Sequence, residues 1–210
     1  MIATLKQIII FDFDGVLVDS LDNLYQINSA AAIALDRSLT KDQYLSAFAG
    51  PLNQKLGEIL SLNEAELEKF INHKRQIFAN HYNGTSVQPF PFALDLIKQA
   101  SDLGTLWILS TAPLEHIRVV LEEHNLLNYF ARIIGQSQQP KSVFLNEAVS
   151  ESERTFFLTD TVGDLKEAGK VDGVISIGVT WGFHQADVLK TGNPSFVAHN
   201  PKDVISFIRD

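Results

Sequence analysis

The chain is most constrained by an apolar run that ends in two aspartates. Residues 7–11 read Gln-Ile-Ile-Ile-Phe, and Asp12, Phe13, Asp14 and Gly15 follow at once. A short run rich in β-branched residues and bounded by a turn signal predicts a buried strand. In open α/β sheets, ligands bind outside the carboxyl ends of the strands. The two carboxylates therefore lie where a functional site is expected.

The two aspartates are expected to have different roles. Side chains alternate along an extended chain, so Asp12 and Asp14 should point in opposite directions. One can be a nucleophile or metal ligand while the other moves a proton. An EF-hand calcium loop is disfavoured, because it needs Gly at position six and Glu at position twelve, where this chain has Leu17 and Asn23. A solvated strand-to-loop turn stays open on these residues alone.

Composition narrows the class of protein. The chain has 210 residues, of which 45% are hydrophobic, enough for one large domain or a core with a smaller insert. It contains no cysteine, which excludes a disulfide framework and a thiolate nucleophile. No apolar stretch approaches the length of a membrane span, and the first apolar run lacks the features of a signal peptide. We therefore expect a cytoplasmic protein with no membrane partner.

The charge of the chain also limits its partners. A net charge of −8 argues against a nucleic-acid-binding groove. An acidic protein that binds an anionic substrate needs a cation close to the binding site.

Beyond residue 85, the pattern alternates between strands and helices. Expected strands cover residues 105–109, 131–135, 154–158, 173–178 and 195–198, and expected helices cover 115–125, 143–149, 164–170 and the residues after Pro201. Pro113 fits the first turn of the helix over 115–125. This alternation predicts the α/β class with a doubly wound parallel sheet.

Residues 20–83 break the alternation. They carry helical patterns over 20–35, from 42 onward, over 52–60 and over 64–82, and no convincing strand. Asn83-Gly84-Thr85 is a turn signal. We therefore expect two domains: an α/β core formed by residues 1–18 and 85–210, and a small helical cap domain, residues 19–84, inserted after the first strand.

Polar residues mark the ends of two later strands. Ser110 and Thr111 offer a hydroxyl and free N–H groups at a helix start, which suit a phosphate, although an ordinary helix cap is the plainer explanation. Asp160 and Asp164 follow the fourth strand, where Asp164 fits a helix cap. In a chain that already has two aspartates at its first strand end, these carboxylates also fit a Mg²⁺ site. Lys141 precedes a helix, and a solvated surface lysine is its plainer interpretation.

The order of these motifs resembles that of a known family. The chain is similar to the haloacid dehalogenase-like (HAD) superfamily, in its phosphoglycolate phosphatase-like branch, which has a Rossmann-like core and a helical cap. The matching segments are residues 12–20, 109–111, 160–164 and 178–182, together with Lys141. The first motif is highly specific, whereas Ser110 and Lys141 carry weight only through their order. The resemblance spans nearly the whole chain.

The resemblance implies a phosphoryl-transfer enzyme that forms an aspartyl-phosphate. Asp12 would be the nucleophile, and Asp14 would protonate the leaving oxygen and then activate water. Mg²⁺ would be held by the Asp12 carboxylate, the backbone carbonyl of Asp14 and Asp160. Asp164 would support the site from close by, through Lys141 or a metal-bound water. The implied metal residues are thus Asp12, Asp14, Asp160 and Asp164.

Other residues would hold the substrate. The resemblance implies that Ser110, Lys141 and backbone N–H groups near Phe13 and Thr111 bind the phosphoryl oxygens. In the cap, Gly50 is the expected substrate contact, because a glycine lets the backbone approach a ligand. An ordinary turn between two cap helices stays open for residues 49–53. We interpret residues 73–75 as a solvated helix face.

The chain departs from the family pattern at two places. Thr159 stands where the family usually has Gly before the first aspartate of its fourth motif, and its hydroxyl could tighten the loop or alter a neighbour's hydrogen bond. In the third motif, an ungapped alignment puts Gln138 at the usual lysine position, so Lys141 must serve from three residues later. If Gln138 replaces the lysine, catalysis should be weak.

The expected function is a Mg²⁺-dependent phosphatase of a small phosphorylated metabolite, acting as a monomer or small homo-oligomer. Asp14 disfavours a dehalogenase, which has no alkoxide leaving group to protonate, and a phosphonatase of the family's known type, which lacks the second aspartate. A phosphomutase of the β-phosphoglucomutase type keeps both aspartates and is the main alternative. A non-catalytic binding or regulatory protein on the same fold is the other.

Overall fold

A computed structural model describes residues 6–81 and 87–210 of the chain. Contacts between Cα atoms divide the chain into two compact units. One unit combines Met1–Asp19 with Gln88–Asp210, and the other is Ser20–Val87. None of the helices in the described ranges is long and apolar enough to cross a membrane.

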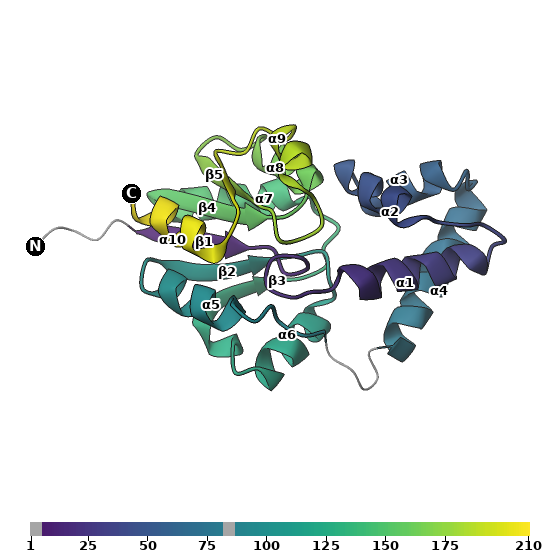
Figure 1. Cartoon of the computed structure of the whole chain (residues 1–210), viewed down its shortest axis with the longest axis horizontal. Coiled ribbons are helices and arrows are strands. Elements are labelled where there is room, and N and C mark those ends of the chain that lie inside the picture. Colours follow the sequence, from purple (N-terminus) through teal and green to yellow (C-terminus); the bar gives the residue numbers. More distant parts are fainter. Residues whose placement is uncertain (1–5, 82–86) are drawn as a thin grey trace, which may run out of the picture. The chain divides into compact units, whose positions relative to one another are not determined.

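The first unit contains a six-stranded sheet in which every neighbouring pair is parallel (Figure 1). The strand order is β3-β2-β1-β4-β5-β6. Its strands agree with the predicted ones to within one residue and are β1 (Gln7–Phe11), β2 (Thr105–Leu109), β3 (Phe130–Ile134), β4 (Arg154–Thr159), β5 (Val174–Val179) and β6 (Phe196–Ala198). The predicted α/β class and parallel sheet are confirmed.

The register of the sheet brings several loop starts to one edge. Phe11, the last residue of β1, pairs with Ile108 of β2 on one side and with Leu158 of β4 on the other. The residues just beyond these three strand ends therefore lie at nearly the same level. Chain order reverses between β1 and β4, and such a reversal is where open α/β sheets bind their ligands.

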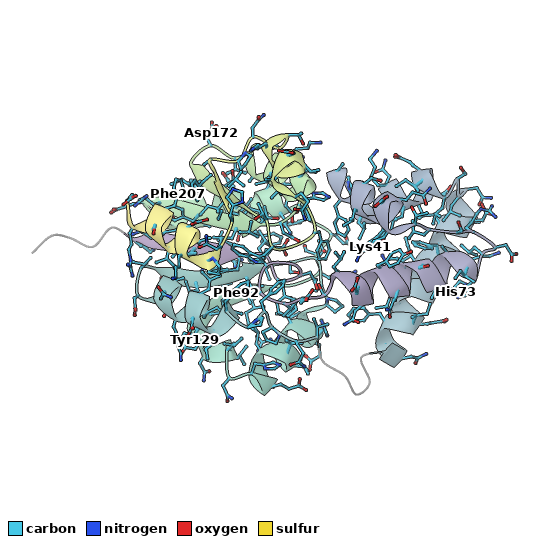
Figure 2. All side chains as sticks on the ribbon, viewed as in Figure 1. Lys41, His73, Phe92, Tyr129, Asp172 and Phe207 are labelled. Carbon is cyan, nitrogen blue, oxygen red and sulfur yellow. The ribbon has the colours of Figure 1, made fainter. Side chains whose placement is uncertain are left out.

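Helices cover both faces of the sheet, as Figure 1 shows. Ile8 and Ile10 of β1 share a buried cluster with Leu145 and Ala148 of α7 (Lys141–Glu151) and with Ala168 of α8 (Val162–Ala168). Successive side chains of a strand point to opposite faces, so Phe156 faces away from this cluster, which contains Phe157. There Phe156 meets Phe207 of α10 (Pro201–Arg209), which is labelled in Figure 2.

The remaining α-helices among the described residues of this unit are α5 (Ala93–Ser101), α6 (Leu114–Glu123) and α9 (Ala186–Lys190), and a short 3₁₀ turn covers Leu127–Tyr129. The sequence pattern does not predict α5 or α9. Pro113 is not in the first turn of α6 but precedes it, with a ψ of 133° that is not helical. Asp164 is not the cap of α8. It lies in the first turn, and Thr161 is the cap, because the Thr161 side chain accepts a hydrogen bond from the Asp164 N–H.

The second unit is helical in its described residues. Its α-helices are α1 (Leu21–Ile33), α2 (Lys41–Ser46), α3 (Leu52–Ile59) and α4 (Glu64–His81), with a short 3₁₀ turn at Ala47–Ala49. They enclose a core of their own that includes Ala31, Tyr44, Leu56 and Phe70. The predicted helices agree with these to within two residues. The turn predicted at residues 83–85 lies outside the described residues.

Candidate active site

Three predicted site residues follow adjacent strands of the core sheet. Asp12 comes directly after β1, Ser110 after β2 and Asp160 after β4. All three are buried, with 6%, 4% and 0% of their surface exposed, respectively. Lys141, the first residue of α7, is also buried, whereas Gln138 is exposed. The core therefore encloses a set of polar side chains at the ligand-binding edge of the sheet.

The Asp12 carboxylate is held from two sides. Its Oδ1 accepts a hydrogen bond of 2.7 Å from the Phe13 N–H, and its Oδ2 lies 2.7 Å from the Lys141 ammonium. The Asp12 N–H donates to the Leu158 carbonyl at 2.9 Å, which continues the pairing of β1 with β4 by one residue. The carboxylate is thus anchored to the sheet and aimed at Lys141.

Lys141 joins two carboxylates that are far apart in the sequence. Its Nζ lies 2.7 Å from Asp12 Oδ2 and 2.7 Å from Asp164 Oδ2. Burial disfavours the ammonium, but Asp12 and Asp164 together raise the pKa of Lys141 above its usual value. Lys141 is therefore a fixed positive charge at the centre of the site, and the surface interpretation of this residue is wrong.

Asp160 is buried more completely than Asp12 and is only partly satisfied. Its Oδ2 accepts a hydrogen bond of 2.8 Å from the Phe183 N–H, while its Oδ1 has no hydrogen-bond partner among the described residues. Two glycines leave room for this side chain. A Cβ atom at Gly15, whose φ is +71°, would lie 1.9 Å from Asp160 Oδ2, and one at Gly182 would lie 2.4 Å from it.

The acidic groups of the site differ in their ease of ionisation. Burial raises the pKa of Asp12 well above its usual range; Lys141 opposes this effect, and the carboxylates of Asp164 and Asp160 add to it. Burial also raises the pKa of Asp160 to about 7, against the hydrogen bond from Phe183. Burial works against ionisation of Asp164 too, but the Lys141 ammonium and several hydrogen bonds hold the pKa of Asp164 below its usual value.

These groups fit a divalent cation. The Lys141 ammonium contacts the carboxylates of Asp12 and Asp164, and the Asp160 carboxylate lies close enough to affect the pKa of Asp12. Ionising all three carboxylates would therefore leave more negative than positive charge, which a bound cation would offset. Among the described residues, no three acidic or histidine side chains converge as a ready-made metal cage. Mg²⁺ does not need such a cage, because it binds through one or two carboxylates and keeps several waters. The orphaned Oδ1 of Asp160 is a ligand atom of the required kind.

Ser110 and Thr111 lie where the chain leaves β2. The Ser110 N–H donates to the Ile134 carbonyl at 2.9 Å, and its Oγ accepts a hydrogen bond of 3.1 Å from the Ala112 N–H. The hydroxyl proton of Ser110 is then available to a ligand. Ser110 is not the cap of α6, because Pro113 occupies that position. Thr111 is exposed.

Asp14 follows the buried residues Asp12 and Phe13 in the loop after β1. It is half-buried, in the turn that contains Gly15, and its backbone forms an isolated bridge with Val18.

The neighbouring Phe13 is fully buried and meets the ring of His116 edge-on, with 6.1 Å between ring centroids. Burial lowers the pKa of His116 to about 4, so this imidazole is neutral at pH 7.

Gly50 belongs to the helical unit and is not placed relative to these residues. Its backbone is extended, with a φ of −167°, a conformation open to any residue. A Cβ atom there would lie 3.3 Å from Lys55 Cε. In the same unit, Lys74 is half-buried, its ammonium donates to Asn53 Oδ1, and it lies over the Phe70 ring. Interpreting residues 73–75 as a solvated helix face is therefore wrong for Lys74.

Several residues that contact the site were missed in the sequence. The buried His184 accepts a hydrogen bond of 3.0 Å from the Val162 N–H through its ring Nδ1, and its backbone N–H donates to the Asp160 carbonyl at 3.2 Å. Trp181 donates from Nε1 to the Val16 carbonyl at 3.2 Å. These contacts join the loop after β5 to the loops after β4 and β1. The resemblance of residues 178–182 to the family was a sequence signal for Trp181 but not for His184.

The comparisons with known proteins agree with this fold. The family model of haloacid dehalogenase-like hydrolases matches residues 9–179. The chain belongs to the haloacid dehalogenase-like hydrolase family. The predicted membership, with its phosphoglycolate phosphatase-like character, is confirmed, and the predicted enzyme class is supported by relatives that are named as phosphatases.

Individual relatives match over nearly their whole length. Phosphoglycolate phosphatase of Vibrio parahaemolyticus is 22% identical over 218 residues, with 96% of each chain covered. Phosphoglycolate phosphatase of Aquifex aeolicus is 25% identical over 224 residues, again with 96% of each covered. A solved haloacid dehalogenase-like hydrolase from Streptococcus pneumoniae has a TM-score of 0.82 at 22% identity and covers 96% of this chain and 98% of its own. This last likeness concerns the fold alone.

Proposed function

We propose that this hydrolase is a Mg²⁺-dependent phosphatase that cleaves a small phosphorylated metabolite through an aspartyl-phosphate on Asp12. The observation that carries the proposal is the environment of Asp12. Its carboxylate is buried at the end of β1, is held by the Phe13 N–H and lies 2.7 Å from a buried lysine. A carboxylate that is fixed and desolvated in this way suits a nucleophile toward phosphorus.

The residues around Asp12 supply the contacts that phosphoryl transfer needs. Charge spreads over three phosphoryl oxygens in the transition state, so fixed donors and positive charge are required. Lys141 provides the positive charge, and the Ser110 hydroxyl provides a buried donor on the neighbouring strand end. Asp14 is half-buried, and its proposed role is to protonate the leaving oxygen and then to take a proton from water.

The proposed ligands of the cation are the carboxylates of Asp12 and Asp160 and the backbone carbonyl of Asp14. Asp164 would support them through its contact with Lys141. When bound, Mg²⁺ supplies the positive charge that offsets both the buried carboxylates and the phosphoryl group. The gathering of three carboxylates near one ammonium and the orphaned Asp160 Oδ1 support this assignment.

The substrate is proposed at the level of a chemical class. The relatives are named for phosphoglycolate, so phosphoglycolate is the first compound to test, within a panel of phosphorylated metabolites. We propose a cytoplasmic enzyme that acts as a monomer or small homo-oligomer. The net charge of −8 supports the expected lack of a nucleic-acid partner.

The proposal is tested with an aryl phosphate, with and without Mg²⁺. Turnover should require Mg²⁺ and fall by at least about 10³-fold in Asp12→Asn, which keeps the shape of the side chain but removes the nucleophile. Asp172→Asn changes an exposed aspartate outside the matching motifs and is the control, with activity unchanged. A folded protein with neither turnover nor Mg²⁺-dependent binding of beryllium fluoride would contradict the proposed phosphatase function.

The role of Asp14 is tested through the leaving group. An alkoxide needs a proton more than a nitrophenolate does, so Asp14→Asn should impair an alkyl phosphate at least about 10-fold more than a nitrophenyl phosphate. Equal losses on both substrates would contradict the role of Asp14 as the acid. The same panel addresses the mutase alternative, because a mutase would convert a sugar monophosphate to its isomer when supplied with a catalytic amount of sugar bisphosphate.

A further inference from the structure

Thr159 is a buried hydroxyl residue at the ligand-binding edge of the sheet whose contacts the proposed function does not use. It is the last residue of β4, pairs with Gly178 of β5 and has none of its surface exposed. Asp160 follows it directly. The backbone of Thr159 is held by the pairing of β4 with β5, and its side chain is enclosed on all sides.

The Thr159 side chain makes two hydrogen bonds within the loop that it begins. Its Oγ1 accepts a hydrogen bond of 3.3 Å from the Thr161 N–H and donates one of 3.2 Å to Asp164 Oδ2. The directions are determined by chemistry, because a backbone N–H only donates and an ionised carboxylate only accepts. Both the single proton and a lone pair of the hydroxyl are therefore committed.

The carboxylate that receives this proton is the one that orients Lys141. Asp164 Oδ2 lies 2.7 Å from Lys141 Nζ, which in turn lies 2.7 Å from Asp12 Oδ2. A continuous chain of contacts thus runs from the Thr161 N–H through Thr159 and Asp164 to the lysine beside Asp12. Residues that hold the ligands of a functional group commonly change activity or affinity by about 10–100-fold when they are lost.

We propose that Thr159 is a positioning residue, whose hydroxyl fixes the Asp164 carboxylate and thereby keeps the Lys141 ammonium aimed at Asp12. A glycine, which the family usually has at this place, supplies neither hydrogen bond. Both hydrogen bonds therefore depend on the Thr159 side chain. Its effect on catalysis rests on the proposed phosphatase function, but its effect on Lys141 does not.

The test compares three substitutions at Thr159 with one on the same strand. Thr159→Val keeps the shape of the side chain and removes both hydrogen bonds, Thr159→Ser keeps the hydroxyl, and Thr159→Gly restores the family residue. Thr155→Val is the matched control. Thr155 is also buried in β4 but bonds Ser152 at 2.7 Å, away from the site.

Steady-state kinetics gives the first readout. In Thr159→Val, kcat should fall about 10-fold while KM changes by less than about 2-fold, because the contact acts through Lys141 on the phosphoryl group. Thr159→Ser should recover kcat to within about 2-fold of the wild type. Thr155→Val should lose thermal stability without losing kcat. Thr159→Gly should lose kcat as Thr159→Val does, and it serves in its place if the valine variant does not fold.

The second readout does not depend on turnover. Two-dimensional ¹⁵N–¹H NMR of lysine side chains should detect the Lys141 ammonium, which burial and two carboxylates protect from exchange with water. Its signal is identified by its absence in Lys141→Met. It should broaden or shift in Thr159→Val and Thr159→Gly and persist in Thr159→Ser and Thr155→Val. If the wild type hydrolyses no phosphate, the proposed function fails and this readout alone decides the role of Thr159.

Three results would overturn the proposal. The first is an unchanged Lys141 signal in both Thr159→Val and Thr159→Gly. The second is a loss of kcat that Thr159→Ser does not recover, and the third is a loss of kcat that Thr155→Val reproduces.

Discussion

At the scale of single residues, Lys141 decides how the site is charged. It is the first residue of α7, yet it is buried against Asp12 and Asp164 rather than extended into solvent. Sequence order favoured Lys141 over Gln138 for the third motif, and the structure puts Lys141 among the carboxylates and leaves Gln138 exposed. Its role in phosphoryl transfer stays a prediction.

Lys141→Met should lower kcat by about 10²–10³-fold, because it removes a positive donor aimed at developing negative charge. It should also lower the melting temperature at pH 7, since two carboxylates lose their shared cation. Aryl phosphate kinetics and thermal melts measure both effects. Gln138→Ala is the control and should change neither. Retention of more than about a tenth of the activity in Lys141→Met would contradict this role.

The side chains that line the site were predictable to different degrees. Asp12, Asp160 and Ser110 could be located because each follows an apolar run that reads as a strand. Phe183 and His184 could not, because they bond Asp160 and Val162 across more than twenty positions from a loop without a pattern of its own. Spacing carries no information about contacts of this kind.

At the scale of elements, strands were predicted more sharply than helices. A buried strand of a parallel sheet is an unbroken apolar run with clear ends, as in Thr105–Leu109. A helix end depends on its cap, and the cap of α8 is Thr161 rather than the more conspicuous Asp164. Helix α9 spans only five residues, Ala186–Lys190, too few for a periodic pattern to emerge.

The loop after β5 leaves no room for a side chain at Gly182. Gly182→Ala should lower activity about 10–100-fold and weaken Mg²⁺ binding, because a Cβ there would lie 2.4 Å from both Asp160 Oδ2 and the Gly15 carbonyl. Gly178→Ala, four positions earlier, would make ordinary contacts with Leu189 at 3.5 Å and Leu165 at 3.6 Å and should be nearly silent. Calorimetric titration with Mg²⁺ and kinetics check both. Equal behaviour of the two variants would refute the steric argument.

In helix α4, the half-buried Lys74 ammonium should lower the free energy of unfolding at neutral pH. Burial lowers the pKa of Lys74 to about 8, whereas the unfolded chain has the usual value of 10.5. Between these pH values the unfolded chain binds more protons, so this group makes stability rise with pH from 8 to 10.5. Below pH 8 the full cost of the buried charge is present, on the order of 2 kcal/mol after allowance for partial exposure.

Lys74→Met should therefore be more stable than the wild type at pH 7, by about 1 kcal/mol once the lost hydrogen bond to Asn53 is deducted. The advantage should shrink by pH 9.5, where the wild-type amine is mostly neutral. Urea unfolding at both pH values measures it. Lys69→Met, on the same helix at an exposed position, is the control and should show no such pH dependence. A constant difference between the Lys74 variant and the wild type would count against the buried-charge explanation.

At the scale of the whole molecule, the site should couple Mg²⁺ to folding. A cation that binds only the folded chain stabilises it by an amount that grows with concentration, about 2.7 kcal/mol at 100 times its dissociation constant. We therefore expect Mg²⁺ to raise the melting temperature by several degrees, and EDTA to reverse the rise and abolish turnover. Asp160→Asn should show a much smaller rise. A potassium salt of equal ionic strength controls for screening, and a rise that it reproduces would exclude specific binding.

The architecture of the chain was more predictable from the sequence than the substrate on which it acts. An alternating pattern of strands and helices, broken by a helical stretch, was enough to specify a parallel sheet and an insert. The identity of the substrate was not predictable, because a metabolite is selected by the shape and charge of its binding site, and sequence patterns do not specify either. Gly50 was proposed from a loop pattern alone, and its extended backbone needs no glycine.

The point at which the chain leaves and re-enters the α/β unit has a consequence for evolution. The Asp19 N–H donates to the Gln88 carbonyl at 3.0 Å, and Val18 bridges Pro89, so the two crossing segments are fastened to each other within that unit. Loop-closure entropy depends only on the logarithm of loop length, so exchanging Ser20–Val87 for a linker of about six residues would alter it by roughly 2 kcal/mol. Insertions of very different size could be accepted between these fastened ends. Evolution can therefore replace the helical unit without changing the α/β unit that carries the candidate site.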